Sequence, residues 1–463
     1  MRTIAKLAAV GSLVTFLTAC ESIFGSYDIY DQDNPSLEAL EQNPSPSIIL
    51  STAQGLLDGW RDQVGGGEGS WLQDLSCFGR EGYYLAPART ILDEFDDALV
   101  PSGGLGWGNT YANIRTINSL LHAVDSVGLM TDQEKEGVRG WAKTIEAAEL
   151  HRQIRIQDAF GIVIQTDQPR NAPLAPIATK AEVFSYILQR YDEAMTHLQN
   201  AGSQFAFQLS PGLAGFDTPA TFLQVNRGLK ARAAVEIQDY ATAQAALAAS
   251  FIDVGADLAI GAYHSFGSGA GDQLNPISDP AGNKWLADTM LVTDAQLQGN
   301  GEVDLRVTTK TAVVPPLTHT GVTSHLRWRL YENPTDPFPI IKNEELILLR
   351  AEVNLATDAG LADINVVRTI SGGLDPIPLA TWQAMTQDER VTELLYNRRY
   401  SLVWEHGHRW VDMRRFNRLD QLTGPRGPGD RVFDMVPFPE DECIARDYQP
   451  AGCSTVEGFR TVQ

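Results

Sequence analysis

The sequence predicts a mainly α-helical fold built from helical hairpins, with long irregular segments between the helices. Two observations lead to this prediction. Capping boxes of the form Thr-x-x-Glu begin at Thr131, Thr179 and Thr386, and each opens a stretch with apolar residues at helical spacing. Between such stretches, residues 62–106 and 251–338 are rich in glycine, proline, aspartate and isolated aromatic residues, without a helical period.

The first half of the chain is expected to hold six helices. The last two are separated by a tight corner, and small alanines alternate with large residues along them. Helical hairpins of tetratricopeptide type need such close contacts, although the sequence shows no strict repeat register. The six predicted helices cover residues 47–61, 107–121, 131–160, 179–198, 218–236 and 239–247.

The segment 251–338 is a long insertion, and insertions with little regular structure are usually functional. Short strand-like runs are expected only at Leu305, Val307, Val313 and Val314. Helical periodicity then returns in a second predicted hairpin, over residues 344–354 and 361–369. After Thr386 we expect one long helix whose buried stripe runs from Val391 through Leu402 to Glu405.

The composition is that of a folded protein with an acidic surface. Of the 463 residues, 43% are hydrophobic and 20% are charged, which allows a sizeable core. The 58 acidic residues outnumber the 36 basic ones, and the formal net charge is −22. Because such a surface repels phosphate backbones, nucleic acid is excluded as the main partner.

The N-terminus carries an export signal. Arg2 and Lys6 precede an apolar run over residues 7–17, which is too short to span a bilayer. The run ends in Leu17-Thr18-Ala19-Cys20, which resembles the lipobox of a bacterial lipoprotein. We therefore expect a signal peptide over residues 1–19, lipidation of Cys20, a tether over residues 20–46 and a single domain over residues 47–463. A plain secretory signal with an incidental cysteine is the alternative, and both predict export.

Export also bears on the other cysteines. Cys443 and Cys453 flank one short loop, and an oxidising compartment favours a disulfide between them. Cys77 is left over and is expected to be a small buried residue.

Two charged clusters could form reactive sites. His406 and His408 are two residues apart and lack a zinc-type partner pair, so buried ion pairs of Arg409, Asp412 and the arginines after them are favoured over a metal site. The acidic residues Asp93, Glu94, Asp96 and Asp97 lack the spacing of a calcium loop and are interpreted as a solvated surface. No catalytic residue, metal or cofactor is predicted.

Several motifs together carry a family resemblance. They are the lipobox, Trp107-x3-Tyr111-x2-Ile114-x3-Asn118, Ile364-Asn365-x2-Arg368, the stretch from Pro339 to Asn354, and Asn397-Arg-Arg-Tyr-x4-Glu-His-Gly-His-Arg-Trp-Val-Asp-Met-Arg-Arg415. With these motifs the chain resembles the SusD/RagB family of outer-membrane nutrient-binding lipoproteins over nearly its whole mature length. One departure is visible: the family usually has Glu directly before Gly, whereas His406 stands here between Glu405 and Gly407.

The resemblance implies a tetratricopeptide-like helical fold with a long irregular, loop-rich ligand-binding face. Family members are not enzymes; they sit lipid-anchored on the surface of Gram-negative bacteria and pass oligosaccharides to a SusC-like TonB-dependent outer-membrane barrel. In some lineages the ligand is a peptide, which stays an alternative here. Two hypotheses of other classes are an exported glycoside hydrolase that uses Asp93 and Glu94, and a helical scaffold that binds only proteins.

The candidate ligand-binding residues follow from sugar chemistry. Sugar rings stack on flat aromatic faces, and their hydroxyls bond to planar polar groups. Each aromatic also has a plainer interpretation as a core or loop anchor, and Tyr111 and Asn118 are assigned to packing. The candidates, in or beside the irregular segments, are Trp71, Tyr83, Tyr84, Trp107, Asn109, Trp285, Trp328 and Tyr331.

Overall fold

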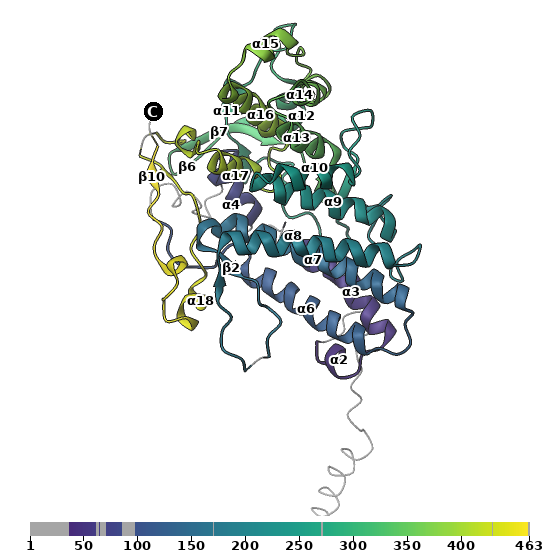
Figure 1. The fold of residues 1–463 in the computed structure, drawn as a ribbon. Helices are drawn as coiled ribbons and strands as arrows, with labels where there is room; N and C mark the ends of the chain where they lie inside the picture. The colour runs from purple at the N-terminus through teal and green to yellow at the C-terminus, as the bar shows by residue number, and fades with distance from the viewer. Residues whose placement is uncertain are drawn as a thin grey trace, which may run out of the picture.

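Long helices dominate the part of the chain that the computed structural model describes, which is residues 37–61, 64, 71–85, 98–169, 171–269, 272–427 and 429–461. Neighbouring helices of the chain pack on one another and form a stack, shown in Figure 1. This arrangement confirms the predicted mainly α, tetratricopeptide-like fold. The stack consists of α3 (Pro46–Arg61), α6 (Trp107–Ser126), α7 (Asp132–Gln157), α8 (Lys180–Asn200), α9 (Pro219–Glu236), α10 (Tyr240–Ala248), α13 (Asn343–Val353) and α14 (Asp358–Ile370).

The predicted capping boxes set the starts of three helices. At α7, the Thr131 hydroxyl accepts from the Glu134 backbone N–H at 3.2 Å, and the Glu134 carboxylate accepts from the Thr131 N–H at 2.8 Å. Thr179 before α8 and Thr386 before α16 (Gln387–Ser401) form the same reciprocal pair. Each box satisfies two backbone donors that a helix start leaves open.

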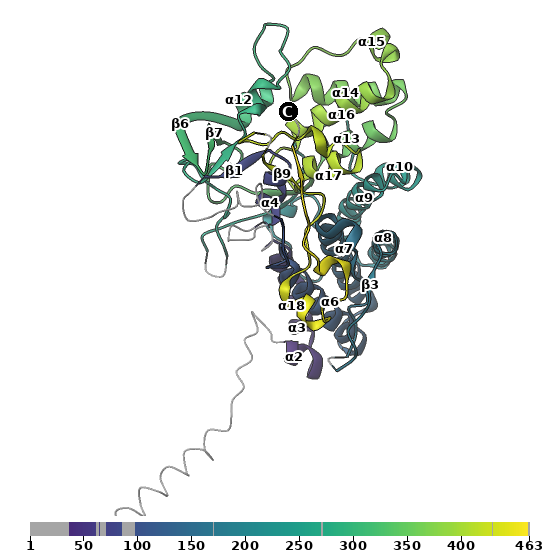
Figure 2. The same ribbon diagram turned by 90° about the vertical axis from the view of Figure 1, so that its left-hand side faces the viewer.

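A four-stranded antiparallel sheet lies beside the helix stack, as Figure 2 shows. Its order is β1 (Gly82–Tyr84), β5 (Trp285–Ala287), β7 (Val322–Trp328) and β6 (Thr311–His319). The segments predicted to be irregular therefore supply a sheet. Val313 and Val314 lie in β6 as expected, but Leu305 and Val307 lie in the helix α12 (Leu305–Lys310). Asp304 explains the difference, because its carboxylate accepts from the Arg306 N–H at 2.9 Å and caps that helix.

The stretch after Thr386 is two helices and not one. The chain leaves helical geometry after Ser401 and re-enters it in α17 (His408–Arg415). Gly407 turns the chain with φ +59°, and a Cβ there would lie 2.4 Å from Leu75, so the close approach requires glycine. The predicted stripe to Glu405 is wrong, because a helical period cannot reveal a turn of this kind.

Buried ion pairs join these two helices to the stack, as the sequence predicted for Asp412 and the arginines after it. The same prediction is wrong for Arg409, which forms no ion pair with any residue that the structure describes. Arg398 donates to Asp412 at 2.6 Å, and Arg415 bridges Asp412 and Glu352. Glu405 pairs with Lys342 at 2.7 Å, and His406 bonds to the Pro339 carbonyl at 2.7 Å. Removing one partner of such a pair costs several kcal/mol, so the stretch fixes the helices in place.

The folded part begins before the predicted boundary at residue 47. The short helix α2 (Leu37–Gln42) lies inside the segment expected to be a tether, yet it packs on α6 and buries Leu40. The reason is that Leu37 and Leu40 supply an apolar face that was overlooked among the polar residues around them. The signal peptide and Cys20 lie outside the described residues.

The remaining elements are short. A disulfide joins Cys443 to Cys453, the pair that the sequence indicated, and Cys77 is buried and forms no disulfide with a described cysteine. None of the described helices has the length and apolar character to cross a membrane. These elements are α4 (Trp71–Phe78), α11 (Met290–Thr293), α15 (Leu379–Ala384), α18 (Glu440–Ala445), and the strand pairs β2 (Ile162–Val163) with β3 (Ile177–Ala178), β4 (Gly261–His264) with β8 (Phe338–Lys342), and β9 (Arg431–Val432) with β10 (Phe459–Arg460).

Candidate ligand-binding groove

A cavity of about 740 Å³ lies between α6, the loop that joins β2 to β3, and α18. We call it the α6 groove. Figures 1 and 2 show α6 with the β2–β3 loop and α18 near it at the same end of the molecule. The floor is made by Trp107, Tyr111, Arg115, Asn118, Ser119 and His122; the loop adds Val163, Gln165, Thr166, Asp167, Gln168, Pro169, Ala172, Pro173, Leu174 and Ala175; α18 adds Glu442 and Arg446; and α2 adds Glu41.

Helical periodicity explains the floor. Trp107, Tyr111, Arg115, Asn118 and His122 are spaced by three or four residues and therefore lie on one face of α6. Residues of the opposite register, such as Ile114, Ile117 and Val124, are fully buried in the helical core. One helix thus carries a core face and a groove face.

The β2–β3 loop is fastened along this face by side-chain hydrogen bonds. The Tyr111 hydroxyl donates to the Val163 carbonyl at 2.8 Å and accepts from the Val163 N–H at 3.0 Å. Further along α6, Asn118 donates to the Thr166 hydroxyl at 3.0 Å, and His122 Nε2 lies 2.8 Å from Asp167. Burial raises the pKa of Tyr111, so its phenol stays neutral and keeps both roles.

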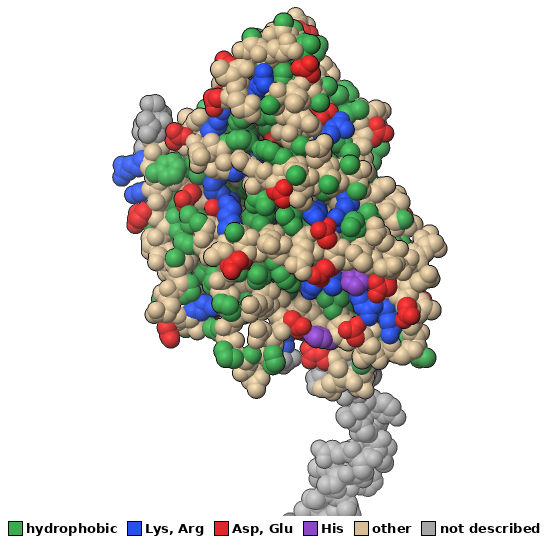
Figure 3. Space-filling model, in the orientation of Figure 1, with side chains coloured by type: hydrophobic (Ala, Val, Ile, Leu, Met, Phe, Trp, Pro, Cys, Tyr) green, Lys and Arg blue, Asp and Glu red, His purple; other side chains and the backbone are tan. Residues whose placement is uncertain are grey.

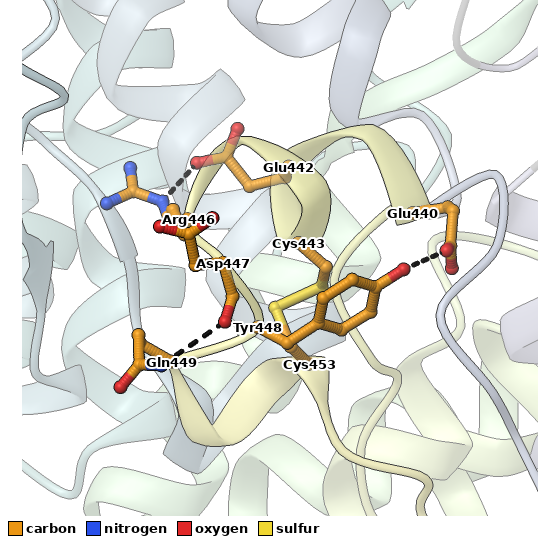
Figure 4. The surroundings of a disulfide bond; sticks show 8 residues. All are labelled: Glu440, Glu442, Cys443, Arg446, Asp447, Tyr448, Gln449 and Cys453. Atoms are coloured by element: carbon orange, nitrogen blue, oxygen red, sulfur yellow. Dashed lines mark hydrogen bonds and ion pairs between the residues drawn. A yellow bond between two sulfur atoms is a disulfide. The ribbon is translucent and has the colours of Figure 1, made fainter.

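The Cys443–Cys453 disulfide lies in the wall of the α6 groove that α18 forms. Figure 4 shows α18 with Glu442 and Arg446 near the Cys443–Cys453 bond, and these two charged side chains pair at 2.6 Å. Below α18, Phe438 packs against Trp107 with ring centroids 5.2 Å apart. Trp107 is therefore a shared anchor for the helix floor and the C-terminal wall.

The groove surface combines planar polar groups with apolar ones. Gln165 and Gln168 are exposed on the loop, and Arg115 is exposed on α6 with no hydrogen bond or ion pair to any residue that the structure describes. Leu174, on the same loop, is 55% exposed. Figure 3 shows apolar side chains along the lower edge of the molecule, where the β2–β3 loop lies in Figure 1. Amides, a guanidinium and apolar contacts are what a site for an uncharged, hydroxyl-rich ligand needs.

Of the residues predicted from the sequence, only Trp107 lines the α6 groove. Trp107 is 6% exposed, so its ring supports the floor and shows little of its face. Asn109 is exposed on the same helix but points outside the groove lining. The side chain of Trp71 and the residues Asp93 and Glu94 lie outside what the structure describes.

Three other predicted residues are buried in a second core around the sheet, namely Tyr83, Trp285 and Trp328. Tyr83 donates to Asp288 at 2.6 Å, and Trp328 stacks on Trp404 with centroids 5.0 Å apart. Trp285 also packs on Trp404. The half-buried Tyr84 packs on Trp285 in an edge-to-face arrangement, with ring centroids 4.7 Å apart. Burial leaves the rings of Tyr83, Trp285 and Trp328 little surface for a ligand, because the loop-rich half of the chain needs aromatics for a core of its own. Tyr331 is buried too, beside a separate cavity of about 380 Å³.

Most of the groove residues are not among those predicted from the sequence. The packing predicted for Tyr111 and Asn118 is confirmed, since Tyr111 packs on Trp107 and Asn118 is buried. Both also line the groove and fasten its loop. One feature of the sequence does indicate the groove face of α6. The polar and aromatic residues from Trp107 to His122 recur at helical spacing, on a separate side of the helix from Ile114 and Ile117. Residues 164–176 gave no signal, because the loop acquires its role only by lying along α6.

Among the described residues, no group of three or more His, Cys, Asp and Glu side chains is placed to hold a metal ion.

No protein-family model matches the sequence, and no curated protein is significantly similar to it. Solved structures are similar in fold. A SusD-like protein from Bacteroides fragilis superposes with a TM-score of 0.68 at 12% identity, covering 92% of this chain and 100% of its own. The chain has a SusD-like fold. At this level of identity the similarity concerns the fold, and the fold agrees with the resemblance seen in the motifs.

The names of two other solved structures with the SusD-like fold state what those proteins bind. A laminarin-binding SusD-like protein has a TM-score of 0.61 at 14% identity, with 88% of this chain and 98% of that chain covered. A surface glycan-binding protein A from Bacteroides uniformis has a TM-score of 0.64 at 15% identity, with 89% and 99% covered.

Proposed function

We propose that this protein is a cell-surface lipoprotein that captures oligosaccharides in the α6 groove and passes them to a SusC-like TonB-dependent outer-membrane transporter. One observation carries the proposal: about nine tenths of this chain superposes on the laminarin-binding protein and on the surface glycan-binding protein. In this role the protein binds its ligand and leaves the ligand's bonds unchanged.

The groove geometry supports a short, uncharged glycan as the ligand. Its volume of about 740 Å³ lies within the usual range of small-molecule sites. The charged side chains that line it are of both signs, with Arg115 and Arg446 against Glu41, Asp167 and Glu442. Since neither sign dominates, the exposed amides of Gln165 and Gln168 are the groups best suited to sugar hydroxyls.

Residues at the start of the sequence support the proposed location. The lipobox at Leu17-Thr18-Ala19-Cys20 would place a diacylated cysteine ahead of α2, and a lipid anchor at this end leaves the helix stack free to meet a barrel. Export to the outer membrane of a Gram-negative bacterium follows from the same proposal.

Isothermal titration of the full-length protein against neutral oligosaccharides and against peptides tests the binding role. A triple variant, Arg115→Ala with Gln165→Ala and Gln168→Ala, removes exposed polar groups without touching the core. Loss of three hydrogen-bonding groups is expected to weaken glycan binding roughly tenfold or more. Asn109→Ala is the matched control, because Asn109 is exposed on α6 but outside the groove.

The outcomes separate the alternatives. Binding of peptides alone would favour a peptide-binding subunit of the same kind of transporter. Turnover of a bound oligosaccharide would favour the hydrolase hypothesis. Glycan binding that is unchanged in the triple variant would move the site away from the α6 groove, and binding of neither ligand class, with or without the cognate barrel, would refute the capture role.

A further inference from the structure

A second cavity, of about 200 Å³, lies between α16, α17 and the turn after α11. We call it the arginine pocket, because three of the side chains that line it are Arg399, Arg409 and Arg418. It shares no lining residue with the α6 groove. Two carboxylates, Asp294 and Asp412, also line it, so the arginines are in excess.

The two carboxylates are already engaged. Asp412 accepts from Arg398 at 2.6 Å and from Arg415 at 2.9 Å, and neither of these arginines lines the pocket. Asp294 pairs with Arg399 at 2.7 Å. Both carboxylates of the lining are therefore already paired with arginines other than Arg409 and Arg418.

Arg409 is the cation left over. Arg418 is held by Asp388 at 2.5 Å and by Thr392 at 2.8 Å. Arg409, in contrast, makes no hydrogen bond or ion pair with any residue that the structure describes, and its Nε is buried without a partner. The Nε of the neighbouring Arg399 is buried and unpartnered as well. A buried guanidinium donor without an acceptor is costly, and most folded proteins avoid it.

The electrostatics of the pocket also indicate that the charge of Arg409 is poorly compensated. Burial, followed by repulsion from Arg399, lowers the pKa of Arg409 to about 9. Among the carboxyls, Glu81 offsets this lowering most, yet it forms no ion pair with Arg409. Because burial raises the pKa of Glu81 to about 7, it carries only part of a charge at neutral pH.

We propose that the arginine pocket binds a small oxyanion, meaning a carboxylate, phosphate or sulfate group, between Arg399 and Arg409. Guanidinium groups present paired donors that match such anions, and an anion here would satisfy both buried Nε atoms and relieve the repulsion between the two cations. The anion arrives either free in solution or as the acid group of a sugar. This site does not depend on glycan capture in the α6 groove.

Thermal melting and isothermal titration of the full-length protein at pH 7 test the site. The probes are sodium phosphate, sodium sulfate and sodium glucuronate, each compared with sodium chloride at equal ionic strength. At least one oxyanion is expected to raise Tm above the chloride control. In Arg409→Gln the affinity for that anion is expected to fall roughly tenfold or more, because a charge-assisted pair is lost. Arg460→Gln is the matched control, since Arg460 is exposed on β10 and does not line the pocket.

The probes also separate the two sources. A response to phosphate or sulfate identifies a free inorganic anion, and a response to glucuronate alone identifies the acid group of a sugar; both support the site. If Arg409→Gln does not fold, Arg409→Lys keeps the charge but loses the planar fork, and it too is expected to bind less tightly than the wild type. The proposal is overturned if no oxyanion raises Tm beyond the chloride control, or if the Arg409 variants keep wild-type affinity.

Discussion

Glu81 shows how one buried side chain shapes the second core. It lies between α4 and β1, is fully buried, and accepts a hydrogen bond from the Trp404 backbone N–H at 3.3 Å. Trp404 itself has a positive φ of 60°, at the turn that separates α16 from α17. The carboxyl of Glu81 thus helps to hold the turn that places Trp404 against Trp285 and Trp328.

Glu81 is expected to make stability depend on pH. Burial raises its pKa from 4.5 to about 7, so the folded state binds this proton more tightly than the unfolded chain. The stabilisation is complete below pH 4.5 and is lost as pH rises through 7. From this group alone the free energy of unfolding should fall by about 3 kcal/mol between pH 5 and pH 8.5. Glu81→Gln should remove that part of the slope.

Urea unfolding of the wild type and of Glu81→Gln at pH 5 and pH 8.5 measures the effect. Glu457→Gln serves as the control, because the Glu457 side chain is exposed and its removal should leave the slope unchanged. Parallel pH profiles for the wild type and Glu81→Gln would show that Glu81 titrates normally in the folded protein.

At the scale of elements, α18 is the piece whose position depends most on one covalent bond. It is short, its first turn carries three acidic residues, and its disulfide ties it to the 3₁₀ turn at Ala451–Cys453. Glu440 also bonds to the Tyr448 hydroxyl (Figure 4). Besides the disulfide, the Phe438 side chain packs on the helical core, and the Glu440 N–H donates to the Ser102 carbonyl at 2.9 Å; these contacts hold this wall of the α6 groove.

Replacing both cysteines with serine is therefore expected to loosen the wall. In the chain-entropy model, the lost cross-link costs about 3 kcal/mol. Hydrogen exchange should speed up over residues 438–456, and any ligand bound in the α6 groove should bind less tightly. Cys77→Ala is the control, because it removes a buried thiol but leaves α18 in place. Unchanged exchange over residues 438–456 would mean that packing alone holds the wall.

Local signals account for the elements that the sequence predicted well. Capping boxes fixed the starts of α7, α8 and α16 to within one residue, because they depend on four consecutive residues only. The sheet could not be found in this way: β1 and β5 are three residues each, and the pair Tyr83 and Leu286 meet from distant parts of the chain. The burial of Trp285 and Trp328 could not be predicted either, because their common partner Trp404 lies in a turn that no helical period reveals.

At the scale of the whole molecule, the charge of −22 bears on the proposed attachment to a membrane. An acidic body is repelled by anionic lipid headgroups, so electrostatic adsorption would not retain it. Under the proposed function, retention would come from covalent lipid on Cys20, since two acyl chains on one cysteine are sufficient for stable anchoring.

Cys20→Ala is accordingly expected to move the protein from the membrane fraction to the soluble fraction of cells that export it. Fractionation after a high-salt wash measures this, with Cys77→Ala as the control that keeps Cys20. A Cys20→Ala protein that still sediments with membranes would show that the anchor lies elsewhere.

The position of α2 has a mechanical consequence. This helix is joined to the groove floor, because Leu40 is buried against the helical core and the Ser119 hydroxyl donates to Glu41 at 2.8 Å. A pull on the chain ahead of Leu37 would therefore load α6 through α2, at the end where His122 and Asp167 fasten the β2–β3 loop. Under the proposed function, tension on the lipid anchor would thus be transmitted to the floor of the α6 groove.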